Sequence, residues 1–258
     1  MKFYSLLAAA ALLVAGATSC RKDDFTISNP PKVVPNAKQM TQTTMFSEPY
    51  TISYNADGTI KEFSRPSGQG GTLKDEFIYN GNTITQINYL DGVKKRDYVI
   101  TMVDGRMAKY VSTTFNNNGN PWIVQSDYFS YDAKGRLVLE MFSTNDRYEY
   151  DYDANDNLVE RRYYDNDVYK VRSQYEYYTD KYEKWMSVHL LDALGRGALK
   201  PMFSKNLRKK VTNTNMETQE VTMEETYTFE TDTDGYILKG KIVGKNGAYT
   251  REWTSVYQ

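Results

Sequence analysis

The sequence predicts an all-β fold, an antiparallel meander of repeated β-hairpins that forms a strongly curved sheet or a soluble barrel. Three observations support this class. The chain of 258 residues contains 23 tyrosines and few helix signals, and tyrosine, threonine, valine and isoleucine favour strands. Turn pairs such as Asn80-Gly81 and Asp91-Gly92 recur and are strong hairpin signals. A short pattern, clearest in residues 128–140, also repeats.

Residues 1–19 have the features of a lipoprotein signal peptide. Lys2 supplies the basic start, and residues 6–15 form an apolar run too short for a permanent transmembrane helix. Ala17-Thr18-Ser19-Cys20 then reads as a lipoprotein cleavage box, with Cys20 as the lipid attachment site. The alternative is an ordinary secretory leader with an incidental cysteine. Because Cys20 is the only cysteine, we expect no internal disulfide in the mature chain.

Residues 20–48 are expected to form a flexible tether, since they include Asn29-Pro30-Pro31 and show no periodicity. Their beginning, Arg21-Lys22-Asp23-Asp24, resembles the surface-export signal of Bacteroidota lipoproteins. That resemblance implies an outer-membrane, lipid-anchored protein exposed on the cell surface, and a lipoprotein facing the periplasm is the alternative. Residues 49–258 are expected to form a single antiparallel β domain.

The repeated unit predicts its own register. A three-residue loop ending at Gly135, in the left-handed conformation that glycine adopts easily, pairs Tyr131 with Leu137 and Phe129 with Leu139. All apolar residues of the unit then fall on one face. Similar units begin at Tyr54 and Tyr152, and weaker ones at Phe115 and within residues 229–237. The turns divide the chain into roughly ten to fourteen strands.

One stretch interrupts the strands. Residues 180–194 have apolar residues at helical spacing, and Asp180 with Glu183 fits a capping box. We therefore expect one inserted helix near 180–194, followed by an irregular connection that contains Pro201.

The heptapeptide Tyr131-Asp132-Ala133-Lys134-Gly135-Arg136-Leu137 resembles one unit of the YD-repeat family, whose hairpins build β shells. Together with the lipoprotein leader, the whole chain resembles an uncharacterised family of Bacteroidota surface lipoproteins with a porin-like antiparallel β domain. The resemblance implies a curved or closed antiparallel sheet and no established activity. The match is confined to a few short stretches, because most other units lack the Arg-Leu pair or the glycine.

A barrel of this kind need not cross a membrane. Lipid-facing strands keep one clean apolar face, but Glu160-Arg161-Arg162 places charge on both faces of one predicted strand. We therefore expect a barrel or sheet wall that is not exposed to lipid.

The sequence offers no catalytic constellation, cofactor motif or metal site. His189 is the only histidine, so a histidine-based triad is unavailable. Residues 151–157 resemble the front of a calcium loop, but Asp156 and Arg162 stand where that loop needs glycine and glutamate, and turn chemistry explains the pattern equally well. A formal net charge of −1 does not favour nucleic acid as a partner.

Aromatic residues are the best ligand-binding candidates, and we single out Trp122, Tyr163, Tyr164 and Trp185. Tyr163 and Tyr164 are adjacent on a strand and must point to opposite faces. We expect a non-catalytic, lipid-anchored cell-surface protein that binds a ligand or has a structural role in the envelope, with a glycan or an envelope protein as partner. Two alternatives stay open: a glycan-binding lipoprotein of an outer-membrane uptake system, and a carboxylate-dependent glycan hydrolase.

Overall fold

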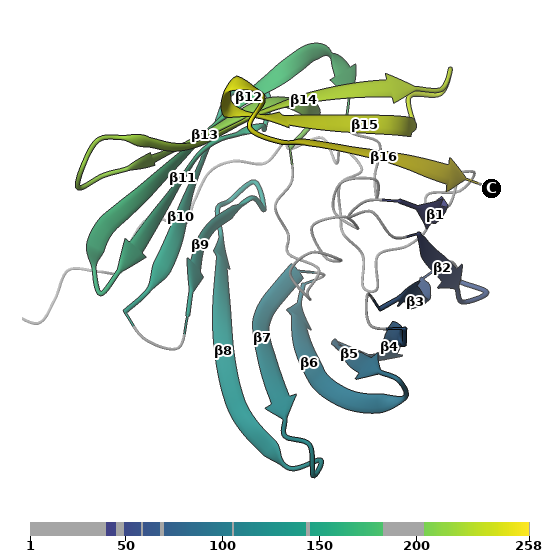
Figure 1. Ribbon diagram of the computed structural model, residues 1–258. Helices are drawn as coiled ribbons and strands as arrows, with labels where there is room; N and C mark the ends of the chain where they lie inside the picture. Colours follow the sequence, from purple (N-terminus) through teal and green to yellow (C-terminus); the bar gives the residue numbers. More distant parts are fainter. Residues whose placement is uncertain are drawn as a thin grey trace, which may run out of the picture.

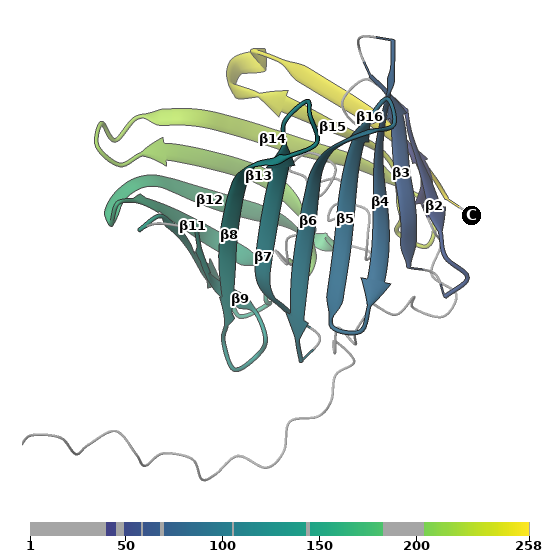
Figure 2. The ribbon, with the colours of Figure 1, turned by 90° about the horizontal axis from the view of Figure 1, so that it is seen from below.

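The strands form one closed antiparallel barrel of 16 strands, in which each strand pairs with its neighbours in sequence (Figures 1 and 2). The computed structural model describes residues 40–44, 49–57, 59–67, 70–104, 106–142, 145–182 and 204–257. The all-β class is confirmed, and the sheet closes. The strands are β1 (Met40–Thr43), β2 (Tyr50–Tyr54), β3 (Ile60–Pro66), β4 (Thr72–Asn80), β5 (Thr83–Leu90), β6 (Val93–Val103), β7 (Arg106–Phe115), β8 (Pro121–Tyr131), β9 (Leu137–Met141), β10 (Arg147–Tyr152), β11 (Leu158–Asp165), β12 (Val168–Tyr182), β13 (Asn206–Asn215), β14 (Val221–Thr231), β15 (Ile237–Gly244) and β16 (Thr250–Tyr257).

Two boundaries differ from the sequence-based expectation. Strand β1 lies inside the range 20–48 that we expected to be a tether, and it closes the barrel by pairing Met40 with Tyr257. The β domain therefore begins at Met40, not at residue 49, and the strand count exceeds fourteen. The expected helix near 180–194 is wrong at its start, because Asp180–Tyr182 continue β12. The rest of the expected helix, residues 183–194, lies outside the described part of the chain. Within the described part, the only helical element is the 3-10 turn Lys245–Gly247.

Apolar side chains form a ring inside one end of the barrel. We call this the proximal end, and it contains Met40 and Tyr257, the first and last strand residues of the described chain. The opposite, distal end contains the β11–β12 turn. Each odd-numbered strand carries a buried apolar residue at its first or second position. The eight residues of this ring are Met40, Ile60, Ile84, Met107, Leu137, Leu158, Leu207 and Ile237. In four copies of the repeated unit, the aliphatic residue after the turn thus belongs to this core: Ile60, Leu137, Leu158 and Ile237.

The hairpin of β8 and β9 shows how the repeated unit folds. As predicted, Gly135 is left-handed, with φ of +83°, and Tyr131 pairs with Leu137. The predicted pairing of Phe129 with Leu139 is wrong, because Phe129 pairs with Glu140. A β-bulge adds one residue to β9 directly after Leu137, so every later side chain of that strand changes face. The predicted single apolar face is therefore also wrong.

The same bulge recurs in every copy of the unit. In five hairpins a residue pairs with the residue six positions later, and the register then shifts by one on the second strand. The five pairs are Tyr54 with Ile60, Phe115 with Pro121, Tyr131 with Leu137, Tyr152 with Leu158, and Thr231 with Ile237. The repeated sequence pattern therefore specifies a turn together with its bulge.

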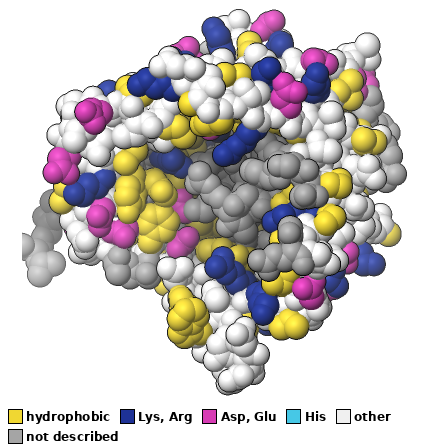
Figure 3. Space-filling view, viewed as in Figure 1, with side chains coloured by type: hydrophobic (Ala, Val, Ile, Leu, Met, Phe, Trp, Pro, Cys, Tyr) yellow, Lys and Arg dark blue, Asp and Glu magenta, His cyan; other side chains and the backbone are white. Residues whose placement is uncertain are grey.

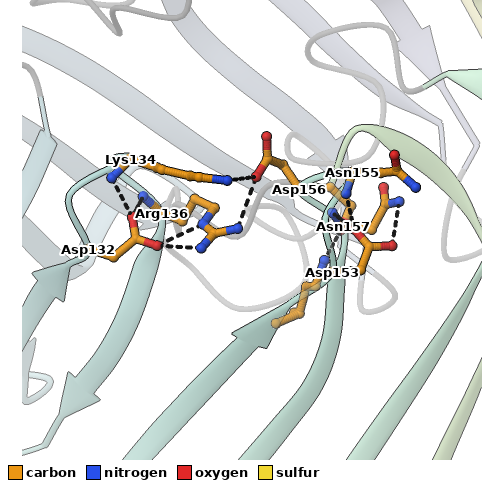
Figure 4. Close-up of polar contacts among 9 residues, drawn as sticks. Asp132, Lys134, Arg136, Asp153, Asn155, Asp156 and Asn157 are labelled. Carbon is orange, nitrogen blue, oxygen red and sulfur yellow. Dashed lines mark hydrogen bonds and ion pairs between the residues drawn. The ribbon is translucent and has the colours of Figure 1, made fainter. Parts of the chain in front are cut away.

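An aspartate or asparagine side chain holds several of these turns from within. In the β8–β9 turn, Oδ1 of Asp132 accepts hydrogen bonds from the backbone N–H groups of Lys134 (3.0 Å) and Arg136 (2.9 Å), as Figure 4 shows. In the β10–β11 turn, Asp153 accepts from the N–H groups of Asn155 and Asn157 at 2.8 Å each. Because both backbone donors are satisfied by one carboxylate, the turn geometry is fixed locally.

Tyrosine hydroxyl groups satisfy the carbonyl groups that lie just before several bulges. The Tyr131 hydroxyl donates to the carbonyl oxygen of Met107 at 2.8 Å, and the Tyr79 hydroxyl donates to that of Ile60 at 3.0 Å. Tyr54 donates in the same way to Met40, and Tyr177 to Leu158. A bulge interrupts the ladder of backbone hydrogen bonds, so these side chains supply what the neighbouring strand does not.

Candidate functional site: arginines and tyrosines inside the barrel

The outer face of the wall carries ion pairs at the middle of its strands. Arg162 of β11 donates to Glu160 at 2.9 Å and to Glu149 of β10 at 3.3 Å, and it also contacts Asp151. Similar outer pairs join Lys74 with Glu76, Lys94 with Asp97, Lys210 with Glu224, Lys239 with Glu230, and Lys241 with Glu252. This wall therefore has no clean apolar band of the kind that faces hydrocarbon in transmembrane barrels.

Arg161, next to Arg162, points into the barrel, because its register partners are the buried Tyr150 and Ser173. The guanidinium of Arg161 lies 4.6 Å from the ring centre of Tyr148. Among the described residues its only hydrogen bond is a long one of 3.4 Å, which it donates to the Ser173 hydroxyl. Its Nε is shielded from solvent and has no acceptor.

A second arginine lies in the same tyrosine-rich region. The guanidinium of Arg208 of β13 lies 5.0 Å from the ring centre of Tyr175, which is two residues from Ser173 on the inner face of β12. Burial acts to lower the pKa of Arg161 and Arg208 does the same, but Tyr175, Tyr148 and Tyr150 raise it overall. We call Tyr148, Arg161, Tyr163, Ser173, Tyr175 and Arg208 the lumen patch.

Two arginines of the inner face lie over tyrosine rings. Arg65 lies over the ring of Tyr50 at 5.3 Å, as Arg161 lies over Tyr148. Within the described ranges, no ion pair joins Arg65 or Arg161 to a carboxylate. Cation–π contact stabilises such charges, but it leaves the N–H donors at the edge of the guanidinium available.

The inner carboxylates are held by neutral donors. Tyr150 donates to Glu140 at 2.5 Å, and burial followed by the charge of Glu140 raises the pKa of Tyr150 well above its usual value. Asp75 accepts from Gln86 at 3.0 Å and from Asn88 at 3.3 Å. Burial raises the pKa of Asp75.

A third inner carboxylate, Glu225 of β14, accepts from the hydroxyl of Tyr227 at 2.6 Å and from that of Tyr249 at 2.5 Å. Burial and the contact with Glu225 raise the pKa of Tyr249 to about 12. Each of these three carboxylates thus accepts a hydrogen bond from a neutral side chain.

The interior that these side chains border is wide. Barrels of 16 strands exceed the size that side chains alone can fill. Figure 3 views the barrel from one end and shows hydrophobic side chains with basic and acidic ones beside them. The inner face of the wall therefore carries aromatic rings, hydroxyls, amides and arginines.

The loop with calcium-like spacing is organised as a turn. Both oxygens of Asp153 accept hydrogen bonds from within the loop, and Asp156 pairs with Arg136 at 2.9 Å (Figure 4). In the ranges the structure describes, no three potential ligand side chains form a cluster that could hold a metal ion.

The structure separates the ligand candidates that the sequence singled out. Tyr163 points inward, with its ring centre 5.1 Å from that of Tyr148. Tyr164 lies on the outer face, stacked on Tyr169 at 5.2 Å and covered by Arg147. Trp122 is 71% exposed on β8, far along the strand from its pairing with β9. Cys20, Trp185 and His189 lie outside the described residues.

Sequence reasoning missed Arg161 and Arg208 as site residues. The run Glu160-Arg161-Arg162 shows that one charge of a strand must face inward, and Tyr148 and Tyr150 alternate on the neighbouring strand. That signal identifies a buried charge, but the pairing of β10 with β11 is needed to place it among the tyrosines.

No helix of the described residues is long and apolar enough to span a membrane. Neither a protein-family model nor a curated protein matches the sequence. Among solved structures, a porin-like protein from Bacteroides uniformis ATCC 8492 is similar, with a TM-score of 0.56 and 14% identity over 85% of this chain and 95% of that chain. A porin-like protein from Bacteroides vulgatus ATCC 8482 gives a TM-score of 0.54 and 12% identity over 85% and 98%. Identities this low establish the fold alone, and by that measure the chain has the antiparallel β-barrel fold of these porin-like proteins.

Proposed function

We propose that this chain is a non-catalytic, lipid-anchored protein of the outer membrane, exposed on the cell surface, whose barrel lumen binds a saccharide. Cys20 is the lipid attachment site in this proposal. The fold shared with porin-like proteins supports an envelope location. The engagement of Glu140, Asp75 and Glu225 by tyrosines and amides supports binding over hydrolysis.

The contrast between the two faces of the wall carries this proposal. The outer face has paired charges, which suit contact with water. The inner face has tyrosine rings with hydroxyl, amide and guanidinium groups beside them, which suit a ligand that has both apolar faces and hydroxyl groups. A purely structural role would not require aromatic rings and polar groups on the inner face in contrast to paired charges on the outer face.

Two measurements test the proposal. A chain that lacks residues 1–20 is expected to be monodisperse in buffer without detergent, and a strict requirement for detergent would contradict a water-facing wall. The same protein is expected to bind members of a glycan array, whereas a uniformly negative array would contradict saccharide binding. Labelling of the full chain with a radioactive fatty acid, abolished by Cys20→Ser, tests the lipid anchor.

Binding of an extended protein segment is a second candidate function, favoured by the edge of β8. Strand β9 pairs with β8 only between Tyr128 and Tyr131, so among the described residues no strand covers residues 121–127 on that side. Trp122 and Val124 are 71% and 60% exposed there. Uncovered strand edges pair with extended peptides. A photo-crosslinker at Val124 should then form an adduct of defined mass in cells, and one at Lys210 on the outer wall should not.

A further inference from the structure

Arg161 and Arg162 are adjacent residues in opposite circumstances. Arg162 has carboxylates on three sides, whereas Arg161 has tyrosine rings and one long hydrogen bond to a hydroxyl. A guanidinium carries five N–H donors, and leaving buried donors without acceptors costs stability. Binding of a neutral ligand would not require the Arg161 guanidinium to lie on the inner face without a carboxylate partner.

We propose that the lumen patch is an anion-binding subsite, in which Arg161 binds the carboxylate or sulfate group of an acidic saccharide whose ring lies against Tyr148 and Tyr163. The positive charge of Arg208 acts on the same region and favours the anion. This inference rests on the proposed function and narrows its ligand to a chemical class. The guanidinium fork matches a carboxylate or sulfate with two parallel hydrogen bonds.

The packing of the patch suits this task. The face of Arg161 lies on Tyr148, so its guanidinium plane is held in place while donors at its edge stay available. Arg208 lies over the ring of Tyr175. Tyr163 packs against Tyr148 and extends the aromatic surface along β11. Ser173 faces Arg161 from β12 and adds a hydroxyl beside its guanidinium. Side chains that are fixed before a ligand arrives lose little freedom on binding.

The test uses the full-length chain, purified from membranes in mild detergent, and isothermal titration with three probes of similar length: oligogalacturonate, sulfated dextran and neutral maltodextrin. Wild-type protein should bind one or both acidic probes at least about ten-fold more tightly than maltodextrin, as expected for a charged hydrogen-bonded pair. The tighter acidic probe identifies the anion as carboxylate or sulfate. Its affinity should fall as salt is added.

Arg161→Gln should weaken the acidic probe at least about ten-fold and leave maltodextrin binding unchanged. Arg162→Gln is the matched control, since it removes a charge from the same strand on the outer face, and it should bind as wild type does. Arg161→Lys keeps the charge without the fork and should give an intermediate affinity. A melting curve of each variant shows whether it is folded. If Arg161→Gln fails to fold, Arg161→Lys takes its place in the test.

The outcomes separate this inference from the function on which it rests. Equal binding of acidic and neutral probes, or an unchanged affinity in both Arg161 variants, would overturn the anion subsite and leave saccharide binding standing. Absence of binding to all three probes would overturn both. Loss of acidic binding in Arg161→Gln and Arg162→Gln alike would also overturn it, because a general effect of charge would then explain the loss.

Discussion

Removal of one tyrosine hydroxyl should measure how much the bulges depend on side-chain hydrogen bonds. In Tyr131→Phe the ring stays in the core, but the carbonyl oxygen of Met107 loses its 2.8 Å hydrogen bond. That carbonyl lies at a bulge between β6 and β7, where the regular ladder is interrupted. Water has poor access there, because Met107 is only 5% exposed.

The expected cost follows from the bond that is lost and the group that is left without a partner. A buried acceptor without a donor costs about 1–3 kcal/mol. For a domain of this size, each kcal/mol lowers Tm by about 2–4 °C. A loss of about 2 kcal/mol therefore corresponds to a fall of about 4–8 °C.

Thermal melts followed by circular dichroism give the measurement, and Tyr128→Phe gives the control. Tyr128 is on the same strand, points outward and makes no hydrogen bond within the described ranges. Removal of the Tyr128 hydroxyl should shift Tm by no more than about 2 °C. Tyr79→Phe removes the corresponding hydrogen bond at the distant bulge of β3, so the double variant of Tyr131→Phe and Tyr79→Phe should show the sum of the two shifts in Tm. Equal Tm values for Tyr131→Phe and Tyr128→Phe would refute the reasoning.

Three further changes test other parts of the barrel. Asp132→Ala should destabilise the protein by about 1–2 kcal/mol in urea unfolding, because two backbone donors lose their acceptor. Asp132→Asn should cost less stability, since Asn116 holds the β7–β8 turn in the same way. Equal losses of stability in the two variants would contradict this. Gly240→Ala should lower stability by about 1–3 kcal/mol, because the new Cβ would lie 2.0 Å from Cζ2 of Trp253, and an unchanged midpoint would show that Trp253 moves freely. Burial raises the pKa of Asp75, so the contribution of the protonated carboxyl to stability is present at low pH and is lost as pH rises through that pKa. Asp75→Asn should therefore gain stability relative to wild type as the pH is raised above about 4, and a difference that stays constant with pH would argue against a raised pKa.

The charged outer wall bears on how the fold relates to a membrane. Glu149, Glu160 and Arg162 form a network on adjacent strands, where a transmembrane barrel would present apolar side chains. A charged side chain on the lipid face costs about 2–4 kcal/mol near the bilayer centre. The charges on the outer face therefore favour contact with water there.

Local chemistry explains which parts of the architecture could be predicted from the sequence. The turn at Gly135 depends on one left-handed residue and on one aspartate, Asp132, which reaches only two and four residues ahead. Strand identity follows from tyrosine and β-branched residues in the same short windows. The expected helix near 180–194 failed at Asp180–Tyr182, because pairing with β13 outweighs a local capping signal there.

By itself the sequence determined the all-β class, the antiparallel order of hairpins and the position of the repeated turns, because each depends on residues a few positions apart. Only the tertiary structure decided that the sheet closes, since closure joins Met40 to Tyr257 across the whole chain. It also decided the face of every residue beyond a bulge, because one added residue reverses the alternation. For that reason Glu140 is buried, and only the paired strands place Arg161 among the tyrosines of the lumen patch.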